Sequence, residues 1–401
     1  MSDRVLKVGV IGLSRAFTLM LPTFVLDPRV MLAAAADPRA EAREAFTADF
    51  GGRTYDHADA LCADPDVDLV YVASPHQFHA AHAVAAAKGG KHILVEKPMA
   101  ITLDECRAMT DAARSAGVQL VVGHSHSFDR PVQRARALIS GGGLGRVRMM
   151  TALNYTDFLY RPRRPEELDT TRGGGVLFSQ GAHQIDIIRL LGGGVVRSVR
   201  AATGAWDPSR PTEGAFSAFL TFADGACATV TYSGYGHFDS DELTGWIGEM
   251  GNAKNPEAYG EARRALRNSN ERNEIAQKNA RAYGASDRGP ARSPSSPEAY
   301  QHFGMLIVSC ERGDIRPLPN GVMIYADHER RFDPLPRPTV PRKEVIDELY
   351  AAIVHGHPPL HDGEWSLATL AVCLAILESA ASGREIVLSH QVPPRPALDL
   401  E

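Results

Sequence analysis

The chain has 401 residues, of which 44% are hydrophobic and 23% are charged. This length is too great for one ordinary hydrophobic core, so we expect a soluble globular protein of two domains. The formal net charge of -5 argues against a general nucleic-acid binder, because such proteins carry a basic face. The five cysteines are widely spaced and form no C-x-x-C pair, which excludes a disulfide framework and a cysteine zinc site as expectations and fits a reducing cytoplasm.

Two apolar stretches bear on the cellular location. The N-terminal stretch is interrupted by Gly12, Ser14 and Arg15 before a secretory signal can form. The later stretch at 367–377 is shorter than a membrane span. We therefore expect a cytoplasmic protein with no membrane partner.

The N-terminus carries a candidate nucleotide-binding loop. A β-branched run ends in Gly12, and a helical pattern follows Leu13, Ser14 and Arg15. A strand, a tight glycine turn and a helix N-terminus together direct backbone N–H groups at an anion such as a pyrophosphate. The motif is imperfect, since the full dinucleotide fingerprint has glycine where this chain has Ser14 and Phe17.

A second predicted strand at 30–36 ends at Asp37. An acidic residue at this position accepts hydrogen bonds from an adenosine ribose, which favours NAD. Asp37 also precedes proline and can cap the next helix, and the two roles are compatible. Arg39 and Arg15 are each placed to meet a 2'-phosphate, so NADP stays open.

A third predicted strand at 67–73 ends at Ser74 and Pro75, and histidines then recur every three residues from His76. No acidic residue has the matching spacing, so we expect no metal site. We interpret His76 and His79 as side chains that bond the backbone or cover a nucleotide.

The apolar run at 93–95 stops at Glu96, Lys97 and Pro98. Such a run predicts a buried parallel strand, and ligands bind at the C-terminal ends of parallel strands. Proline keeps the preceding residue extended, which gives the Lys97 side chain a defined direction. Strands alternating with helices up to residue 123 predict a parallel, doubly wound α/β sheet.

The rest of the chain has a different pattern. An Asp-Gly hairpin signal and few helices predict a mostly antiparallel sheet. A polar segment at 239–297 indicates a long mobile insertion. The predicted strands are 147–158, 195–206, 215–222, 226–233, 305–309 and 321–325, and helices at 343–355 and 365–380 are expected to pack on the first domain.

A glycine run at 173–175 precedes a helical pattern that contains His183 and Asp186. Glycine permits close approach of a ligand. The two polar residues are one turn apart, so Asp186 can orient the imidazole or bond another neighbour.

These motifs resemble the Gfo/Idh/MocA oxidoreductases, named for glucose-fructose oxidoreductase and inositol dehydrogenase. The resemblance rests on 8–12, the strand ending at Ser74, the Glu-Lys-Pro motif at 96–98 and the stretch from the glycine run to Asp186. It covers 5–235 well and the remainder loosely. Within the family, the resemblance is to phthalate-pathway enzymes that oxidise 4,5-dihydro-4,5-dihydroxyphthalate to the catechol.

The resemblance implies a Rossmann domain at 1–125 and a substrate-binding and oligomerisation domain at 126–401, in a homodimer or homotetramer. It implies hydride transfer between NAD(P) and a hydroxyl-bearing carbon, with Lys97 and His183 as catalytic residues. An unperturbed lysine is a poor base at neutral pH, and the sequence leaves open which of the two accepts the proton. The inositol dehydrogenase branch commonly has aspartate where this chain has Ser179, so that branch's proton relay is not expected here.

An arginine-rich loop lies between the first strand of the second domain and the glycine run. Guanidinium groups bind carboxylates through paired hydrogen bonds, so the loop predicts an anionic substrate, with Ser179 nearby. Acidic residues in the same loop favour the alternative of a solvated, self-balanced segment. The arginines are Arg161, Arg163, Arg164 and Arg172, and the acidic residues are Glu166, Glu167 and Asp169.

Two other functions share these motifs. A sugar or inositol dehydrogenase would have the same nucleotide loop, and turnover of carbohydrates would identify it. A non-catalytic, nucleotide-dependent ligand sensor could use the same fold, although retention of Lys97 and His183 argues against it.

Overall fold

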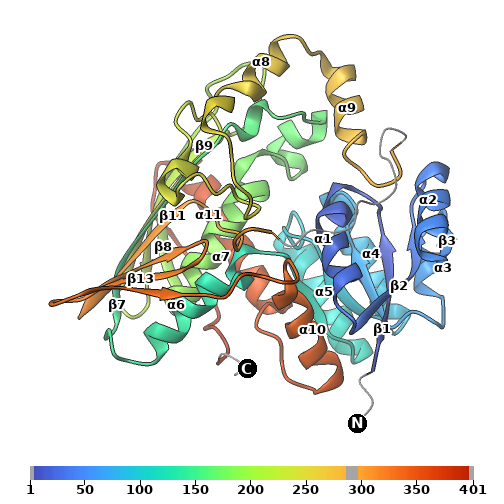
Figure 1. Ribbon diagram of the computed structural model, residues 1–401, viewed down its shortest axis with the longest axis horizontal. Helices are drawn as coiled ribbons and strands as arrows, with labels where there is room; N and C mark the ends of the chain where they lie inside the picture. The colour runs from blue at the N-terminus through green and yellow to red at the C-terminus, as the bar shows by residue number, and fades with distance from the viewer. Residues whose placement is uncertain (1–3, 286–296, 397–401) are drawn as a thin grey trace.

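The computed structural model describes residues 4–285 and 297–396. Two sheets stand side by side in Figure 1. The first has six parallel strands in the order β3-β2-β1-β4-β5-β6, which is the doubly wound order with its switch point between β1 and β4. The strands are β1 Leu6–Ile11, β2 Val30–Ala36, β3 Arg53–Tyr55, β4 Leu69–Val72, β5 His92–Val95 and β6 Leu120–Val122.

Helices cover the first sheet, and every residue of β4 is buried, as expected for parallel strands covered on both faces. The predicted α/β class and doubly wound topology are confirmed. β3 and α3 were not predicted, because each is too short for a periodic pattern. The helices are α1 Arg15–Leu26, α2 Ala40–Phe50, α3 Ala58–Cys62, α4 His79–Lys88 and α5 Leu103–Ala116.

The second sheet has nine strands in the order β14-β13-β12-β11-β7-β10-β9-β8-β15. Its pairs are antiparallel except β10 with β7, so the expected mostly antiparallel sheet is confirmed. Gly225 has φ 90° in the tight turn between β9 and β10, where the hairpin was predicted. The strands are β7 Val147–Tyr155, β8 Val196–Gly204, β9 Ala215–Phe222, β10 Cys227–Ser233, β11 Met305–Cys310, β12 Gly313–Leu318, β13 Gly321–Tyr325, β14 Arg330–Pro334 and β15 Ile386–Val387.

Four helices lie between the sheets or against them. α6 (Arg130–Ser140) and α7 (Ala182–Leu191) belong to the second domain. α10 (Lys343–Val354) buries Val345 and Ile346 in the same core as β1 and α1. α11 (Gly363–Ser382) packs on β8, α5 and α7.

α11 corrects one expectation. The apolar stretch was predicted to fall short of a membrane span, but the helix has 20 residues and is long and apolar enough by length and composition. It is the one such helix among the described residues. Most of it is buried inside the protein, which accounts for its apolar sequence.

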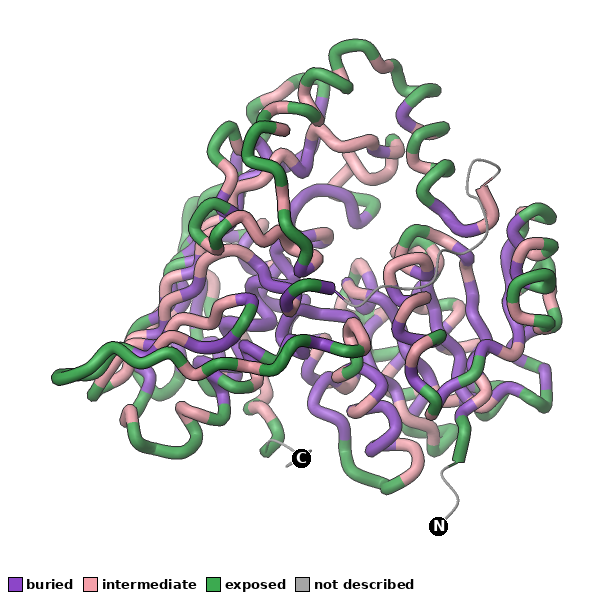
Figure 2. The backbone as a smooth tube through the Cα atoms, viewed as in Figure 1, coloured by how far each residue is buried: buried purple, intermediate pink, exposed green. Residues whose placement is uncertain are grey.

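The insertion forms an arch from the second sheet to the first domain (Figure 1), and much of it is exposed along α8 and α9 (Figure 2). It contains η7 Ser240–Thr244, η8 Pro256–Ala258, α8 Glu261–Arg267 and α9 Glu271–Asn279. The expected mobile segment is therefore folded over 239–285, and 286–296 lie outside the described residues.

Two residues in the last part of the described arch hold it to the rest of the protein, one on each side. Glu274 of α9 accepts hydrogen bonds from the Arg210 guanidinium at 2.9 Å and from the Arg163 backbone N–H at 3.0 Å. Tyr283 packs edge-on against Phe17 of α1, with ring centroids 5.3 Å apart. Its hydroxyl donates to Asp49 of α2 at 2.5 Å. The insertion thus bridges the two domains.

Candidate active site

The turn between β1 and α1 is built to approach another loop closely. Gly12 has φ 91°, and a Cβ there would lie 2.9 Å from the Ala73 carbonyl oxygen and the Ser74 nitrogen. Ser14 caps α1, accepting from the Ala16 N–H at 3.2 Å and donating to Ala73 O at 2.7 Å. Ser14 departs from the glycine fingerprint because its hydroxyl joins the two loops. The exposed helix N-terminus beside this turn fits a dinucleotide phosphate.

Asp37 lies at the C-terminal end of β2 and is fully hydrogen-bonded. One carboxylate oxygen accepts from the Leu13 N–H at 2.8 Å and from Arg39 Nη2 at 3.0 Å. The other accepts from the Arg39 N–H at 2.9 Å and from Arg39 Nε at 3.0 Å. An adenosine ribose would therefore compete with the Arg39 side chain for this carboxylate.

The predicted histidines after β4 bond backbone carbonyls. His79 is buried, and its two ring nitrogens lie 2.9 Å from Pro98 O and 2.9 Å from Ser74 O. His76 Nδ1 lies 3.3 Å from Gly173 O, which ties the first domain to the glycine run. Burial lowers the pKa of His76 to about 3, so its ring is neutral.

Glu96 and Lys97 directly follow the last residue of β5, as predicted. The Tyr71 hydroxyl donates to Glu96 at 2.5 Å, and burial raises the pKa of this carboxyl. Lys97 Nζ donates at 2.5 Å to the backbone carbonyl of Ser179, so Ser179 contributes its main chain to this contact. Burial lowers the pKa of Lys97 to about 8.

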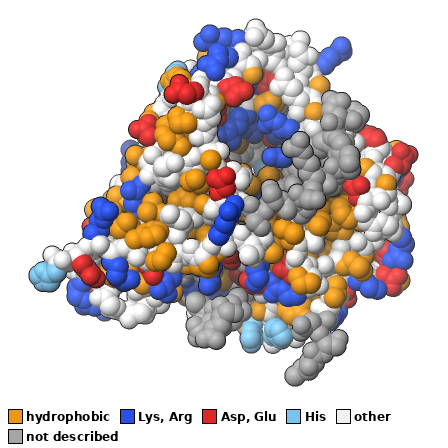
Figure 3. All heavy atoms as spheres, in the orientation of Figure 1, with side chains coloured by type: hydrophobic (Ala, Val, Ile, Leu, Met, Phe, Trp, Pro, Cys, Tyr) orange, Lys and Arg blue, Asp and Glu red, His pale blue; other side chains and the backbone are white. Residues whose placement is uncertain are grey.

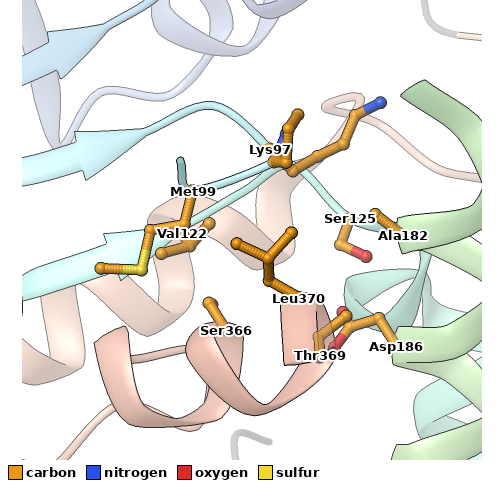
Figure 4. Close-up of a pocket in the computed structure, with 10 residues that line it drawn as sticks. Lys97, Met99, Val122, Ser125, Ala182, Asp186, Ser366, Thr369 and Leu370 are labelled. Carbon is orange, nitrogen blue, oxygen red and sulfur yellow. Dashed lines mark hydrogen bonds between the residues drawn. The ribbon is translucent and has the colours of Figure 1, made fainter. Parts of the chain in front are cut away.

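Figure 4 shows the Lys97 amine pointing away from Ser366 and Leu370. These two residues line a cavity of about 30 Å³ behind the lysine stem. That volume is far below the roughly 150 Å³ of a cavity that accepts benzene, so the cavity does not hold a ring-sized substrate. The reactive end of Lys97 lies on the opposite side, toward Ser179.

His183 lies on α7 and is 5% exposed. Its Nδ1 has no hydrogen-bond partner among the described residues. Burial, reinforced by the nearby Lys97 charge, lowers the pKa of His183 well below its usual value. The structure therefore brings the two predicted catalytic residues together, with a neutral imidazole beside the ammonium.

Asp186 does not orient His183, which corrects one of the two predicted roles. Its carboxylate accepts from the Trp365 indole N–H at 2.6 Å and from Thr369 Oγ1 at 3.1 Å, and it also bonds Ser127 Oγ. The Asp186 side chain therefore points from α7 toward α11, and its hydrogen bonds connect these two helices.

Three residues after β6 were missed as site candidates. Asp129 bridges two imidazoles, with its oxygens 2.9 Å from His124 Nε2 and 2.6 Å from His126 Nδ1. The His126 ring lies 4.7 Å from that of His183, and its Nε2 lies 3.5 Å from a Glu249 oxygen. The signal was available, because a His-x-His segment follows a parallel strand at its ligand-binding end.

The same three side chains have ligand atoms within 4.8 Å of one another, a spacing that could hold a metal ion. In this structure each of the two imidazoles has one ring nitrogen hydrogen-bonded to Asp129. The neighbouring charges are mixed, since the charge of Arg342 opposes protonation of His124 while Glu249 lies 3.5 Å from His126. We therefore describe the group as a hydrogen-bonded network.

The predicted arginines separate into two groups. Burial lowers the pKa of Arg161, but the charges of Asp157 and Glu249 outweigh burial and raise this pKa above its usual value. Arg163 is buried 3.5 Å above the Phe158 ring, and its Nε has no partner among the described residues. Arg164 instead bonds Asn279 of α9 at 2.8 Å, and Arg172 is exposed. Figure 3 shows Lys and Arg side chains gathered in a hollow beneath the arch.

Among the acidic residues of the loop, Glu167 contacts the insertion as well as the loop itself. Glu167 lies 3.6 Å from Arg163 and also pairs with Lys278 of α9. The predicted self-balanced loop is thus partly right, but the balance includes a residue more than a hundred positions away. Arg342 was missed as well, and its positive charge acts on both Lys97 and His183.

Comparison with known proteins agrees with this geometry. Residues 6–124 match the Gfo/Idh/MocA oxidoreductase family model for the NAD-binding Rossmann fold, and residues 132–253 match a C-terminal domain of the same family. The chain is 48% identical over 378 residues to 1-carboxy-3-chloro-3,4-dihydroxycyclohexa-1,5-diene dehydrogenase of Comamonas testosteroni, covering 93% of this chain and 94% of that one.

Two solved structures support the fold. A crystal structure of a Bordetella bronchiseptica protein is 43% identical, covers 96% of this chain and all of its own chain, and has a TM-score of 0.89. Levoglucosan dehydrogenase, solved with NADH and levoglucosan, is 20% identical over 96% of this chain and 99% of its own, with a TM-score of 0.71. The protein thus belongs to the Gfo/Idh/MocA family and is an NAD-binding dehydrogenase.

Proposed function

We propose that this protein is a cytoplasmic dehydrogenase that oxidises a carboxylated cis-dihydrodiol to the corresponding catechol. The observation that carries the proposal is the position of two arginines near the predicted catalytic lysine. The charge of Arg163 acts on Lys97, and the charge of Glu249 acts on both Lys97 and Arg161. The Comamonas testosteroni relative supports it, because its name describes a ring with one carboxyl group and a vicinal diol.

The reaction divides between cofactor and protein. A nicotinamide dinucleotide held at the Gly12 turn would supply the hydride acceptor for the carbinol carbon. Lys97, positively charged at neutral pH, holds the hydroxyl oxygen, and a neutral base of the protein takes its proton. Loss of the hydride and the proton leaves a hydroxyketone, and enolisation of this ketone forms the aromatic catechol.

Carboxylate recognition falls to the two arginines. Arg161 has Asp157 as a partner at 2.9 Å on a side chain that is 37% exposed, so it can turn toward an anionic group. Arg163 is buried and its Nη2 donates to Phe158 O at 2.7 Å, but its Nε has no partner among the described residues and could donate to a carboxylate. Two guanidinium groups match two carboxylates, which leads us to propose the phthalate dihydrodiol, 4,5-dihydro-4,5-dihydroxyphthalate, as the preferred substrate.

A substrate panel tests the proposal. The purified protein is mixed with NAD or NADP and with the phthalate dihydrodiol, a monocarboxylated dihydrodiol, an uncharged arene dihydrodiol, inositol and glucose, and formation of reduced cofactor is followed. Carboxylated diols should be oxidised fastest. Faster oxidation of inositol or glucose would make the protein a sugar-type dehydrogenase. Thermal stabilisation by a ligand with no turnover would favour the sensor.

We also propose that the protein forms a homodimer or homotetramer through the outer face of the nine-stranded sheet. Phe219 and Met149 are 44% and 49% exposed on this face. On β10, Thr229 pairs with Phe219 of β9, and Cys227, two residues earlier on the same face, pairs with Met149 of β7. The two exposed side chains are therefore neighbours on one face of the sheet. Light scattering of the protein in solution, before and after Phe219→Glu, tests this assembly.

A further inference from the structure

The site contains a carboxylate–imidazole pair, but it is not the pair expected from the helix spacing. Asp186 turns away from His183, whereas an oxygen of Asp129 lies 2.6 Å from Nδ1 of His126. The His126 ring lies 4.7 Å from that of His183 and 5.0 Å from Phe303. We infer that His126 takes the hydroxyl proton of the substrate and that Asp129 positions its ring, an inference that rests on the proposed function.

The geometry sets the tautomer of His126. Since Nδ1 faces the Asp129 carboxylate, that nitrogen carries the hydrogen, and the lone pair is on Nε2. The same orientation of an imidazole by a buried carboxylate produces the general base of serine hydrolases. His126 occupies the loop just after β6, at the edge of the sheet where ligands of this fold bind.

His183 is less suited to the same task. It has no carboxylate partner among the described residues, and its neighbours include the Lys97 ammonium. Protonation would place a second positive charge beside that group. Burial also opposes charge on His126, yet Asp129 and Glu249 hold the pKa of His126 above its ordinary value. His183 can still donate to or accept from the substrate as a neutral group.

The charged groups that face His126 come from three segments. Asp129 and His124 belong to its own loop, Glu249 to the insertion and His183 to α7. Glu249 lies 3.5 Å from Nε2 and is 31% exposed, so it connects the imidazole with solvent.

The proton balance is complete. The substrate O–H bond breaks and an Nε2–H bond forms while the hydride leaves the carbon for the nicotinamide. The proton on Nε2 is then released to water, while the Glu249 carboxylate, 3.5 Å from Nε2, stabilises the imidazolium until it leaves.

The test is the pH dependence of kcat/KM with the best carboxylated dihydrodiol. A general base must be neutral, so activity of the natural protein rises with pH through the ionisation of His126. His126→Asn should lower kcat roughly 100-fold, with a much smaller change in KM. It should also remove the rise of activity with pH, which forms the acidic limb of the profile. Asp129→Asn should lower kcat and shift the limb to lower pH, because a negative neighbour is lost. Glu249→Gln should shift the limb in the same direction.

Two measurements guard against misfolding. NADH binding and the melting temperature are recorded for each variant, and added imidazole should restore part of the activity of His126→Gly. His92→Asn is the matched control, since His92 lies half-buried at the opposite end of β5 from Lys97. The His92→Asn variant should keep the kcat of the natural protein and the pH profile of its kcat/KM.

The contrary results separate the two proposals. If His126→Asn keeps the acidic limb and His183→Asn loses it, the inference is overturned and the base is His183. If the natural protein oxidises no dihydrodiol, the proposed function fails and this inference fails with it. Retention of the limb in His183→Asn, together with its loss in His126→Asn, supports the assignment.

Discussion

Lys97→Met separates a catalytic lysine from a structural one. Lys97 is partly buried at the end of β5 and donates to Ser179 O at 2.5 Å. Burial lowers its pKa from 10.5 to about 8, so the fold opposes the charge that the proposed reaction needs. Methionine fills a similar volume without charge. The variant should therefore lose turnover and keep or gain stability.

The magnitude follows from the pKa. The fall of the Lys97 pKa from 10.5 to about 8 corresponds to about 3 kcal/mol of unfavourable free energy for the buried ammonium. The hydrogen bond to Ser179 O, worth about 2 kcal/mol, is lost in the variant. The net expectation is a gain of about 1 kcal/mol at pH 7, or a rise of about 2 °C in melting temperature.

The stability difference between the natural protein and Lys97→Met depends on pH. Because the folded-state pKa lies below the unfolded one, the penalty for the natural protein is complete below about pH 8. It declines between pH 8 and 10.5, as the unfolded lysine alone keeps its proton. The stability advantage of Lys97→Met should therefore shrink across this interval.

Thermal melts across this pH range and turnover with a carboxylated dihydrodiol make the assay. Turnover should fall by roughly 100-fold or more, while NADH affinity changes less. A melting temperature lowered by several degrees at pH 7 would show that Lys97 supports the fold. Near-normal turnover would remove it from the chemistry.

Three further predictions concern the cofactor, the substrate and the core. If Asp37 holds the ribose, NAD should bind more tightly than NADP and Asp37→Ala should narrow the gap in titrations; tighter binding of NADP by the natural protein would show that Arg39 dominates. Arg161→Ala should raise KM about 10-fold for carboxylated diols, most strongly at low salt, with Arg172→Ala as the unaffected control; equal effects on charged and uncharged diols would contradict this. Asp186→Asn should lower unfolding free energy by about 1–3 kcal/mol in denaturant titrations and leave the acidic limb of the pH profile in place; loss of that limb would return Asp186 to the proton relay.

The sequence predicted those parts of the site that are local to one strand end. The turn at Gly12 and the Lys97 strand end follow directly from a buried run that stops at polar or glycine residues. The same reasoning predicted the doubly wound sheet, because its strands alternate with helices along the chain. β3 has only three residues, too few to show a period, and β12 contains Gly313, Asp314 and Pro317, residue types that are uncommon in strands.

Contacts between distant segments could not be predicted in this way. The spacing of His183 and Asp186 permits a bond between them, but Trp365 of α11 competes for the carboxylate from 179 positions away. The pairing of His126 with Glu249 likewise depends on how the insertion folds back. Polar composition suggested a mobile segment, whereas anchors at Glu274 and Tyr283 tie its described part to both domains.

The most direct test of the central claim is the ratio of kcat/KM for the phthalate dihydrodiol to that for the corresponding dihydrodiol without carboxyl groups, measured with NAD at low salt. Loss of the charge-assisted pairing with Arg161 and Arg163 would cost about 3 kcal/mol, so the account predicts a ratio of roughly 100. The ratio should fall as salt is added. A ratio near one, or faster reduction of NAD with inositol or glucose than with either diol, would contradict the account.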